Sequence, residues 1–203
     1  MLIPTTLGLM VVAYLLGSVP FSFIVARFCG VDLRTVGSGN IGAANVWRSC
    51  GFVPFVTAMV LDMLKGFVLP FVAIIYLKIP ALSVIAISAS VMLGHTFSIY
   101  IGFKGGKAVA TGAGVILAIF PPAMISGMIA WIGAFALTRI SAVSSLSAAA
   151  ATTIVVLIGM TQGYLEVVYA VFTCIGTSII IVLHRSNIAR MIAGTENRFQ
   201  KPS

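Results

Sequence analysis

Three polar segments of this 203-residue chain combine cations with glycines in a way that suits the binding of phosphate. The first, GSGNIGAANVWR at positions 37–48, has three glycines within six residues, which let the backbone bend and present N–H groups to an anion. Ser38 adds a hydroxyl, and Arg48 adds a planar guanidinium suited to phosphate oxygens. The pattern is neither the phosphate loop GxxxxGK(S/T) nor GxGxxG after a strand, so a plain glycine-rich chain reversal remains the alternative.

The second segment, GHTFSIYIGFKGGKAVAT at positions 94–111, places KGGK (residues 104–107) directly ahead of an apolar run. A helix start offers unpaired N–H groups and a partial positive charge, so two lysines and two glycines there predict a phosphate cradle. Both lysines could instead be topology anchors. His95 lies at the inner end of the preceding apolar run, where a lone histidine is more often a packing residue than a ligand.

The third segment, HRSNIARMIAGTE at positions 184–196, follows the last apolar run. At helical spacing His184 and Asn187 share one face, and Arg190 continues that face. An imidazole, an amide and a guanidinium would then lie together. The alternative is a basic amphipathic tail lying on anionic lipid.

Acidic residues are too scarce for several common kinds of active site. The chain has four Asp and Glu against twelve Lys and Arg, a net charge of +8. Paired-carboxylate chemistry and a carboxylate metal site are therefore not expected, no GxSxG indicates a serine triad, and the three cysteines form no CxxC pair. Asp62 and Lys65 are spaced i, i+3 inside one apolar run, and we predict that they pair with each other.

The elements that must position these segments are membrane helices. Hydrophobic residues make up 60% of the chain and charged residues 8%, against about 25% charged in a soluble domain. A spanning helix needs about 20 residues, and most of the apolar runs reach that length: 4–26, 52–77, 80–100, 109–120, 123–137, 143–160 and 164–183. Pro121-Pro122 separates the short fourth run from the fifth, with one kinked helix as the alternative. We predict an all-α polytopic integral membrane protein with about seven transmembrane helices and a single domain over residues 1–203.

Charge placement predicts the orientation of these helices. The first run has no basic residue ahead of it, so we expect a retained helix and not a cleaved signal. With seven spans, Lys78 is alone on one side, and the positive-inside rule puts the N-terminus outside and the C-terminus in the cytoplasm. The basic residues are dispersed over several loops, which argues against nucleic-acid binding. The cytoplasmic cations would be Arg27, Arg34, Arg48, Lys104, Lys107, Arg139, Arg185, Arg190, Arg198 and Lys201.

In their order and spacing, the three segments closely resemble the cytoplasmic motifs of the bacterial acyl-phosphate:glycerol-3-phosphate acyltransferases. The resemblance runs through the whole chain, although Ala44 stands where the family usually has threonine and Ser98 where it often has proline. It implies a seven-helix enzyme of the bacterial inner (cytoplasmic) membrane, with its active site facing the cytoplasm. Such an enzyme transfers a fatty acyl group from acyl phosphate to the 1-hydroxyl of glycerol 3-phosphate, giving lysophosphatidic acid and phosphate. No HxxxxD follows either histidine, in keeping with this donor.

The resemblance also implies roles for particular residues. Arg48, Lys104 and Lys107 would bind phosphate, and His184 would take the hydroxyl proton unless the leaving phosphate does so. We expect the catalytic residues to be Ser38, Arg48, Lys107, His184 and Asn187, and the substrate-binding residues to be Gly37, Gly39, Asn40, Asn45, His95, Lys104, Gly105, Gly106, Arg190 and Glu196. The expected partners are the two substrates and membrane lipid, with no cofactor or metal and a monomeric state. The alternative function is a transporter of phosphate or a phosphorylated metabolite, which would want polar groups through the membrane midplane.

Overall fold

The computed structural model describes residues 2–199, and every regular element in that part of the chain is helical, as predicted. The chain forms two compact units, Met1–Ile119 and Phe120–Ser203. Several helical stretches are long and apolar enough to cross a membrane, and one further span results if the helices Val167–Leu183 and Arg185–Ile192, bent by 55° to each other, are counted together. Those stretches within the described residues are Pro4–Phe28, Phe52–Ile75, Ala81–Ile101, Pro121–Thr138 and Ser141–Thr161.

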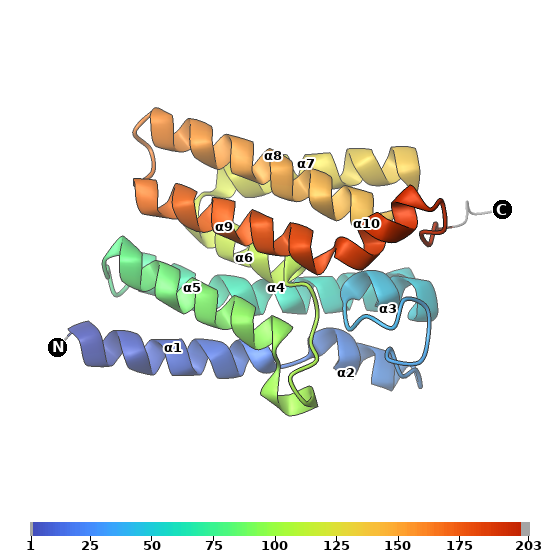
Figure 1. The fold of residues 1–203 in the computed structure, drawn as a ribbon. Coiled ribbons are helices and arrows are strands. Elements are labelled where there is room, and N and C mark those ends of the chain that lie inside the picture. Colours follow the sequence, from blue (N-terminus) through green and yellow to red (C-terminus); the bar gives the residue numbers. More distant parts are fainter. Residues whose placement is uncertain (1, 200–203) are drawn as a thin grey trace. The chain divides into compact units, whose positions relative to one another are not determined.

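The first unit pairs its long helices closely (Figure 1). Its elements are α1 (Leu2–Ser18), α2 (Phe21–Phe28), α3 (Ala43–Cys50), α4 (Phe52–Ile75), α5 (Ala81–Thr96), η1 (Ile99–Ile101) and α6 (Val109–Ile119). Gly66 of α4 lies on the backbone of Thr111 in α6, and Gly17 of α1 lies on the backbone of Val91 in α5. A side chain at either glycine would overlap that backbone, so small residues are what allow these helices to approach.

The first apolar run is not one continuous helix. It breaks at Val19 and Pro20, where α1 ends and α2 begins, because proline has no N–H to continue the ladder. The break leaves carbonyl groups that side chains from other parts of the unit satisfy. Ser98 Oγ donates to the carbonyl of Ser18 at 2.5 Å, and Lys65 Nζ donates to the carbonyl of Val19 at 2.7 Å.

The second unit contains α7 (Pro121–Thr138), α8 (Ser141–Thr161), α9 (Val167–Leu183) and α10 (Arg185–Ile192). Helix α8 packs against both α7 and α9, and the hydroxyl groups of Thr153 and Thr177 meet at 2.7 Å between α8 and α9. The predicted break between the fourth and fifth runs is confirmed, since α6 ends at Ile119 and α7 begins at Pro121. With 11 residues, α6 is about 16 Å long and shorter than the hydrocarbon core.

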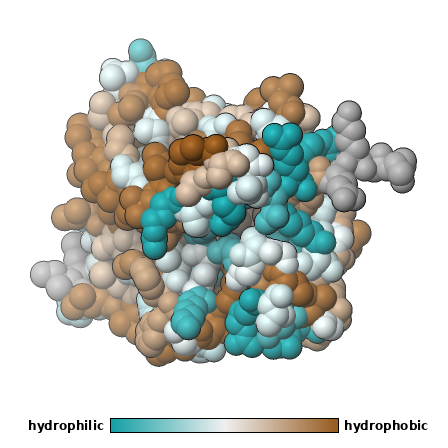
Figure 2. All heavy atoms as spheres, turned by 45° about the vertical axis from the view of Figure 1, so that its right-hand side comes forward, coloured by the Kyte–Doolittle hydropathy of each residue, from teal (hydrophilic) through white to brown (hydrophobic). Residues whose placement is uncertain are grey.

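Hydrophobic side chains cover much of the surface drawn in Figure 2, and hydrophilic ones gather in separate patches. On the candidate spans Leu82 is 71% exposed, Ile129 is 65% exposed and Leu137 is 87% exposed. Water would not favour so many exposed large hydrophobic side chains, whereas lipid does. The exposed surface and the composition therefore both indicate a protein embedded in a membrane.

Candidate functional site

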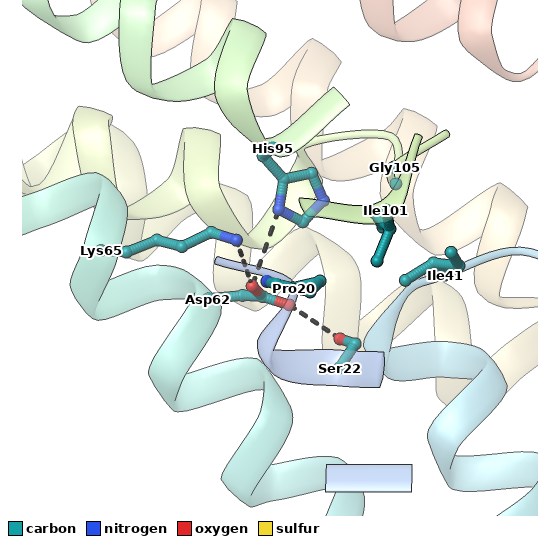
Figure 3. A pocket seen from close by; sticks show the side chains of 9 residues that line it. Pro20, Ser22, Ile41, Asp62, Lys65, His95, Ile101 and Gly105 are labelled. Atoms are coloured by element: carbon teal, nitrogen blue, oxygen red, sulfur yellow. Dashed lines mark hydrogen bonds and ion pairs between the residues drawn. The ribbon is translucent and has the colours of Figure 1, made fainter. Parts of the chain in front are cut away.

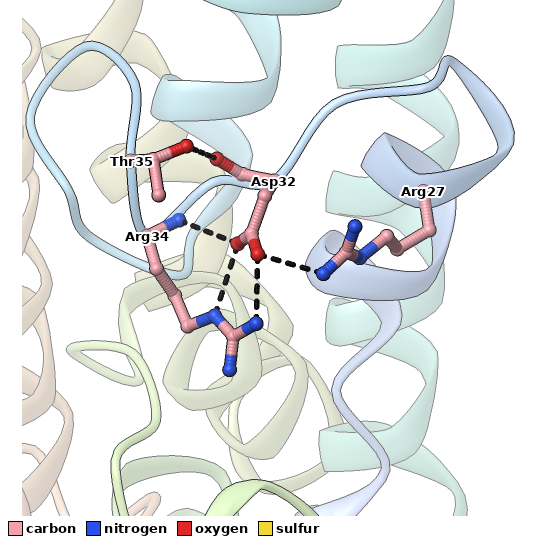
Figure 4. Close-up of polar contacts among 4 residues, drawn as sticks. All are labelled: Arg27, Asp32, Arg34 and Thr35. Carbon is pink, nitrogen blue, oxygen red and sulfur yellow. Dashed lines mark hydrogen bonds and ion pairs between the residues drawn. The ribbon is translucent and has the colours of Figure 1, made fainter.

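An arginine–aspartate lock holds the chain just ahead of the first glycine-rich segment (Figure 4). Asp32 accepts hydrogen bonds from Arg27 Nη2 at 2.7 Å and from Arg34 Nε and Nη2 at 3.0 and 2.7 Å. Its Oδ1 also accepts the backbone N–H of Arg34 at 3.0 Å. These hydrogen bonds, above all those from Arg34, hold the pKa of Asp32 well below its ordinary value. This lock was not predicted from the sequence, where its local signal is an aspartate flanked by two arginines.

Asn45 then fixes the shape of the first segment from inside. Its Oδ1 accepts the N–H of Ser38 at 3.0 Å, and its Nδ2 donates to the carbonyls of Leu33 and Val36, both at 3.1 Å. Gly37 has φ +58 and lies against Asn45 Oδ1, so a side chain there would overlap the amide. Asn45 is buried, and its side chain stabilises the loop by hydrogen bonds to the loop's own backbone.

The first segment ends in helix α3, which presents Arg48 in its last turn. Val46 anchors this helix in a buried cluster with Ala26, Leu33 and Ala58. Arg48 is half-buried, whereas Ser38 is exposed and Asn40 is half-buried at the tip of the loop. The loop therefore offers a hydroxyl and an amide near its tip and a guanidinium in the short helix that follows.

The second segment folds back onto the end of α5. The N–H of Gly105 donates to the carbonyl of Thr96 at 3.0 Å, and the N–H of Gly106 donates to the carbonyl of His95 at 3.1 Å. A side chain at Gly106 would overlap both His95 Nε2 and the carbonyl oxygen of Ile41, which belongs to the first segment. The structure thus brings the first two polar segments together. Lys104 is exposed and Lys107 is half-buried beside this contact.

A buried charge cluster lies beneath the two loops, in a pocket drawn in Figure 3. Asp62 and Lys65 form the predicted ion pair, with Oδ1 and Nζ 2.7 Å apart and each side chain at most 2% exposed. Asp62 Oδ2 accepts a hydrogen bond from Ser22 Oγ at 2.7 Å. His95 faces the same carboxylate, with Nδ1 3.6 Å from Asp62 Oδ1 and 3.0 Å from Thr111 Oγ1. The ion pair was predicted from the sequence, whereas the partners Ser22 and Thr111 were not.

The third segment lies in the second unit, at the bend between α9 and α10. His184 is buried there, and its Nδ1 lies 2.8 Å from the carbonyl oxygen of Ile180. A carbonyl only accepts, so Nδ1 carries the hydrogen and Nε2 is the acceptor nitrogen of the neutral ring. That tautomer suits a proton acceptor.

Glu196 organises the rest of the third segment. Its Oε1 accepts a hydrogen bond from Asn187 Nδ2 and its Oε2 accepts one from Arg190 Nε, both at 2.7 Å. The Glu196 side chain is only 3% exposed. Asn187 and Arg190, two of the three residues predicted to share a face, are thus held together by one carboxylate, whereas His184 bonds to Ile180 instead.

The fold and these segments define a class: an all-helical membrane protein with glycine-rich cationic loops suited to phosphate. The sequence model of the family described as glycerol-3-phosphate acyltransferase matches residues 7–194. A glycerol-3-phosphate acyltransferase of Roseiflexus sp. is 52% identical over 97% of this chain and 96% of the relative, and one of Geobacter sulfurreducens is 41% identical over 93% and 95%.

Solved structures give the same result. The crystal structure of PlsY, an integral membrane glycerol 3-phosphate acyltransferase, in its glycerol 3-phosphate form has a TM-score of 0.89 and 37% identity, covering 97% of this chain and 96% of that one. The lysophosphatidic acid form has a TM-score of 0.87 and 35% identity. The chain belongs to the glycerol-3-phosphate acyltransferase family, and it is an acyltransferase. The transporter alternative is therefore set aside.

Proposed function

We propose that this acyltransferase takes its acyl group from acyl phosphate and delivers it to the 1-hydroxyl of glycerol 3-phosphate. The observation that carries the proposal is the contact of Gly106 with Ile41, which joins two glycine-rich cationic loops in one unit. Both substrates carry phosphate, so a site for them needs cations and backbone N–H groups more than carboxylates. The resemblance of all three segments to the acyl-phosphate family supports the choice of donor.

In the proposed reaction the hydroxyl oxygen attacks the acyl carbonyl carbon and forms the ester bond. The bond from that carbon to the phosphate oxygen breaks, and phosphate leaves with its electron pair. The hydroxyl proton passes to His184 Nε2 or to an oxygen of the leaving phosphate. Acyl phosphate is already activated, so positioning and charge stabilisation would supply most of the rate.

The remaining roles follow the chemistry of each side chain. Arg48, Lys104 and Lys107 neutralise phosphate oxygens, and the glycines beside them let the backbone approach. Ser38 and Asn187 orient phosphate or the acyl carbonyl, and Arg190 and Glu196 keep Asn187 in place. Asn45 and His95 support the loops from within.

We further propose seven crossing segments, with α6 as the short one, so that the termini lie on opposite sides of the bacterial inner membrane. Helix α6 has only 11 residues, so the loop ahead of it would have to enter the membrane interface for this segment to cross. The N-terminus would be outside, and all three polar segments would face the cytoplasm. Both phosphate substrates are charged, so a cytoplasmic mouth reached laterally by the acyl chain suits them.

The decisive experiment compares two donors. Detergent-purified protein receives radiolabelled glycerol 3-phosphate with either acyl phosphate or acyl-CoA, and a reaction without protein measures uncatalysed acylation. We expect labelled lysophosphatidic acid above background when the donor is acyl phosphate, and none above background when the donor is acyl-CoA. Comparable turnover of acyl-CoA would overturn the proposed donor.

A further inference from the structure

The acyl-transfer chemistry proposed above gives no role to Asp62, the buried carboxylate beneath the two glycine-rich loops of the first unit. The side chain is 2% exposed and is held from two directions, by Lys65 Nζ at 2.7 Å and by Ser22 Oγ at 2.7 Å. Lys65 in turn donates to the carbonyl of Val19 at 2.7 Å. Helix α2, helix α4 and the break after α1 therefore meet at this carboxylate.

Stability alone is a weak reason to bury these two charges. Taking ions out of water costs several kcal/mol for each, and apolar side chains of similar volume are often as stable in their place. The presence of Asp62 and Lys65 is therefore better explained by a third group that the carboxylate faces.

The carboxylate faces the imidazole of His95 (Figure 3). Nδ1 lies 3.6 Å from Asp62 Oδ1 and 3.0 Å from Thr111 Oγ1. A carboxylate only accepts, so its presence favours the tautomer with hydrogen on Nδ1. Two groups from different helices, Asp62 of α4 and Thr111 of α6, thus orient one edge of the ring.

The other edge of the ring abuts the loops that carry the cations. A side-chain carbon at Gly106 would overlap His95 Nε2 and the carbonyl oxygen of Ile41. The carbonyl of His95 also accepts the N–H of Gly106 at 3.1 Å. Because the ring lies against Gly106 and leaves no room there, the position of the ring limits how closely the loop of Lys104 and Lys107 can approach the first segment.

The pocket around these groups is small. Its cavity volume is about 10 Å³, whereas pockets for whole ligands span about 300–1,000 Å³. The lining includes Pro20, Ser22, Ile41, Asp62, Lys65, His95 and the two loop glycines. An acyl substrate does not fit there, so Asp62 would act on the reaction through His95 and not by touching the substrate.

We propose that Asp62 is a positioning residue for phosphate binding: together with Thr111 it fixes the His95 ring, which sets the approach of the KGGK loop to the first segment. The proposal rests on the proposed function, since it assumes that the two loops bind the phosphate substrates. It predicts an effect on KM that is larger than the effect on kcat.

The test uses the double variant D62N/K65M, which removes the carboxylate without leaving a buried ammonium unpaired. We expect KM for at least one of the two phosphate substrates to rise about tenfold, with kcat within about threefold, because the His95 ring loses the carboxylate that faces its Nδ1 at 3.6 Å. A tenfold change in KM corresponds to about 1.4 kcal/mol. Ser88→Ala is the matched control, since Ser88 is a buried α5 residue whose hydroxyl bonds to the carbonyl of Val84 in the same helix. It should keep both constants of the wild type.

A milder variant covers the case in which the double variant does not fold. Thr111→Val is nearly isosteric and removes only the hydroxyl at His95 Nδ1, so KM should rise about fivefold. Unchanged KM in every variant that folds, or a fall in kcat at unchanged KM, would overturn the positioning role. An inactive wild type with acyl phosphate would instead reject the proposed function, and the two failures are therefore distinguishable.

Discussion

The carbonyl oxygen of Ile41 lies against Gly106 so closely that a side-chain carbon at position 106 would overlap it. This contact joins the first polar segment to the second, across more than sixty residues of sequence.

Gly106→Ala should lower kcat/KM by at least about tenfold, because the added methyl group collides with a backbone oxygen and with His95, neither of which is a flexible chain end. Gly133→Ala in α7 is the control, since nothing lies within 4 Å of a side-chain carbon there. Steady-state kinetics on both purified variants makes the comparison. Equal activity of the two would mean that the approach of the loops is not needed.

Lys107→Ala and Arg48→Ala should each lose about one to two decades in rate, whereas Lys78→Ala should stay close to wild type. A phosphate that loses a charge-assisted partner forfeits about 1.5–3 kcal/mol if the contact is made in the transition state. Arg48→Lys should also impair the enzyme, because an ammonium cannot reproduce two parallel hydrogen bonds. Kinetics on correctly inserted variants is the measurement. Small and equal losses at Lys107 and Lys78 would return the KGGK loop to a topology anchor.

Glu196→Ala should lower both the apparent Tm and kcat, because Asn187 and Arg190 each lose a hydrogen bond to its carboxylate. The expected destabilisation is about 1–3 kcal/mol, the cost of leaving the buried amide of Asn187 without its partner. The lost ion pair adds little, because Arg190 is partly exposed. Arg185→Ala is the control, because Arg185 lies in the same helix and its side chain is exposed. Thermal unfolding in detergent together with kinetics measures both effects. A Tm and kcat like those of the control would show that the carboxylate does not organise this segment.

The Asp32 lock should be insensitive to pH down to about pH 5. The folded-state pKa of Asp32 is below its ordinary value of 3.8, so the lock is complete above about pH 5 and is lost as pH falls through the folded-state pKa. Hydrogen-exchange protection of the Arg34 amide, which bonds to Asp32 Oδ1, should be constant from pH 7 to pH 5. Asp32→Asn should lower that protection across the whole range. Protection in this variant equal to that of the wild type would reject the lock.

A reporter fused after Ser203 should read as cytoplasmic, and so should a tag inserted near Val31. This expectation follows from the placement of the loop cations, because Lys78 lies alone on the opposite side. Cysteine labelling with a membrane-impermeant reagent in intact cells would check both points. An external signal at either point would break the seven-segment topology.

The sequence by itself determined the features that depend on near neighbours along the chain. The apolar runs follow from composition and length, and the pairing of Asp62 with Lys65 follows from helical spacing, because i and i+3 lie on one face in any helix. The break at Pro121 follows from the missing N–H of proline. The three polar segments were visible for the same reason, since each is contiguous.

Only the tertiary structure decided which distant residues meet. The partners Ser22 and His95 reach Asp62 from α2 and α5, and Ile41 reaches Gly106 from another loop. Such contacts depend on how each helix is rotated and how closely its glycines let it approach a neighbour, which no local spacing encodes. The same holds for Asn45, whose side-chain amide turns inward and forms hydrogen bonds with the backbone of its own loop.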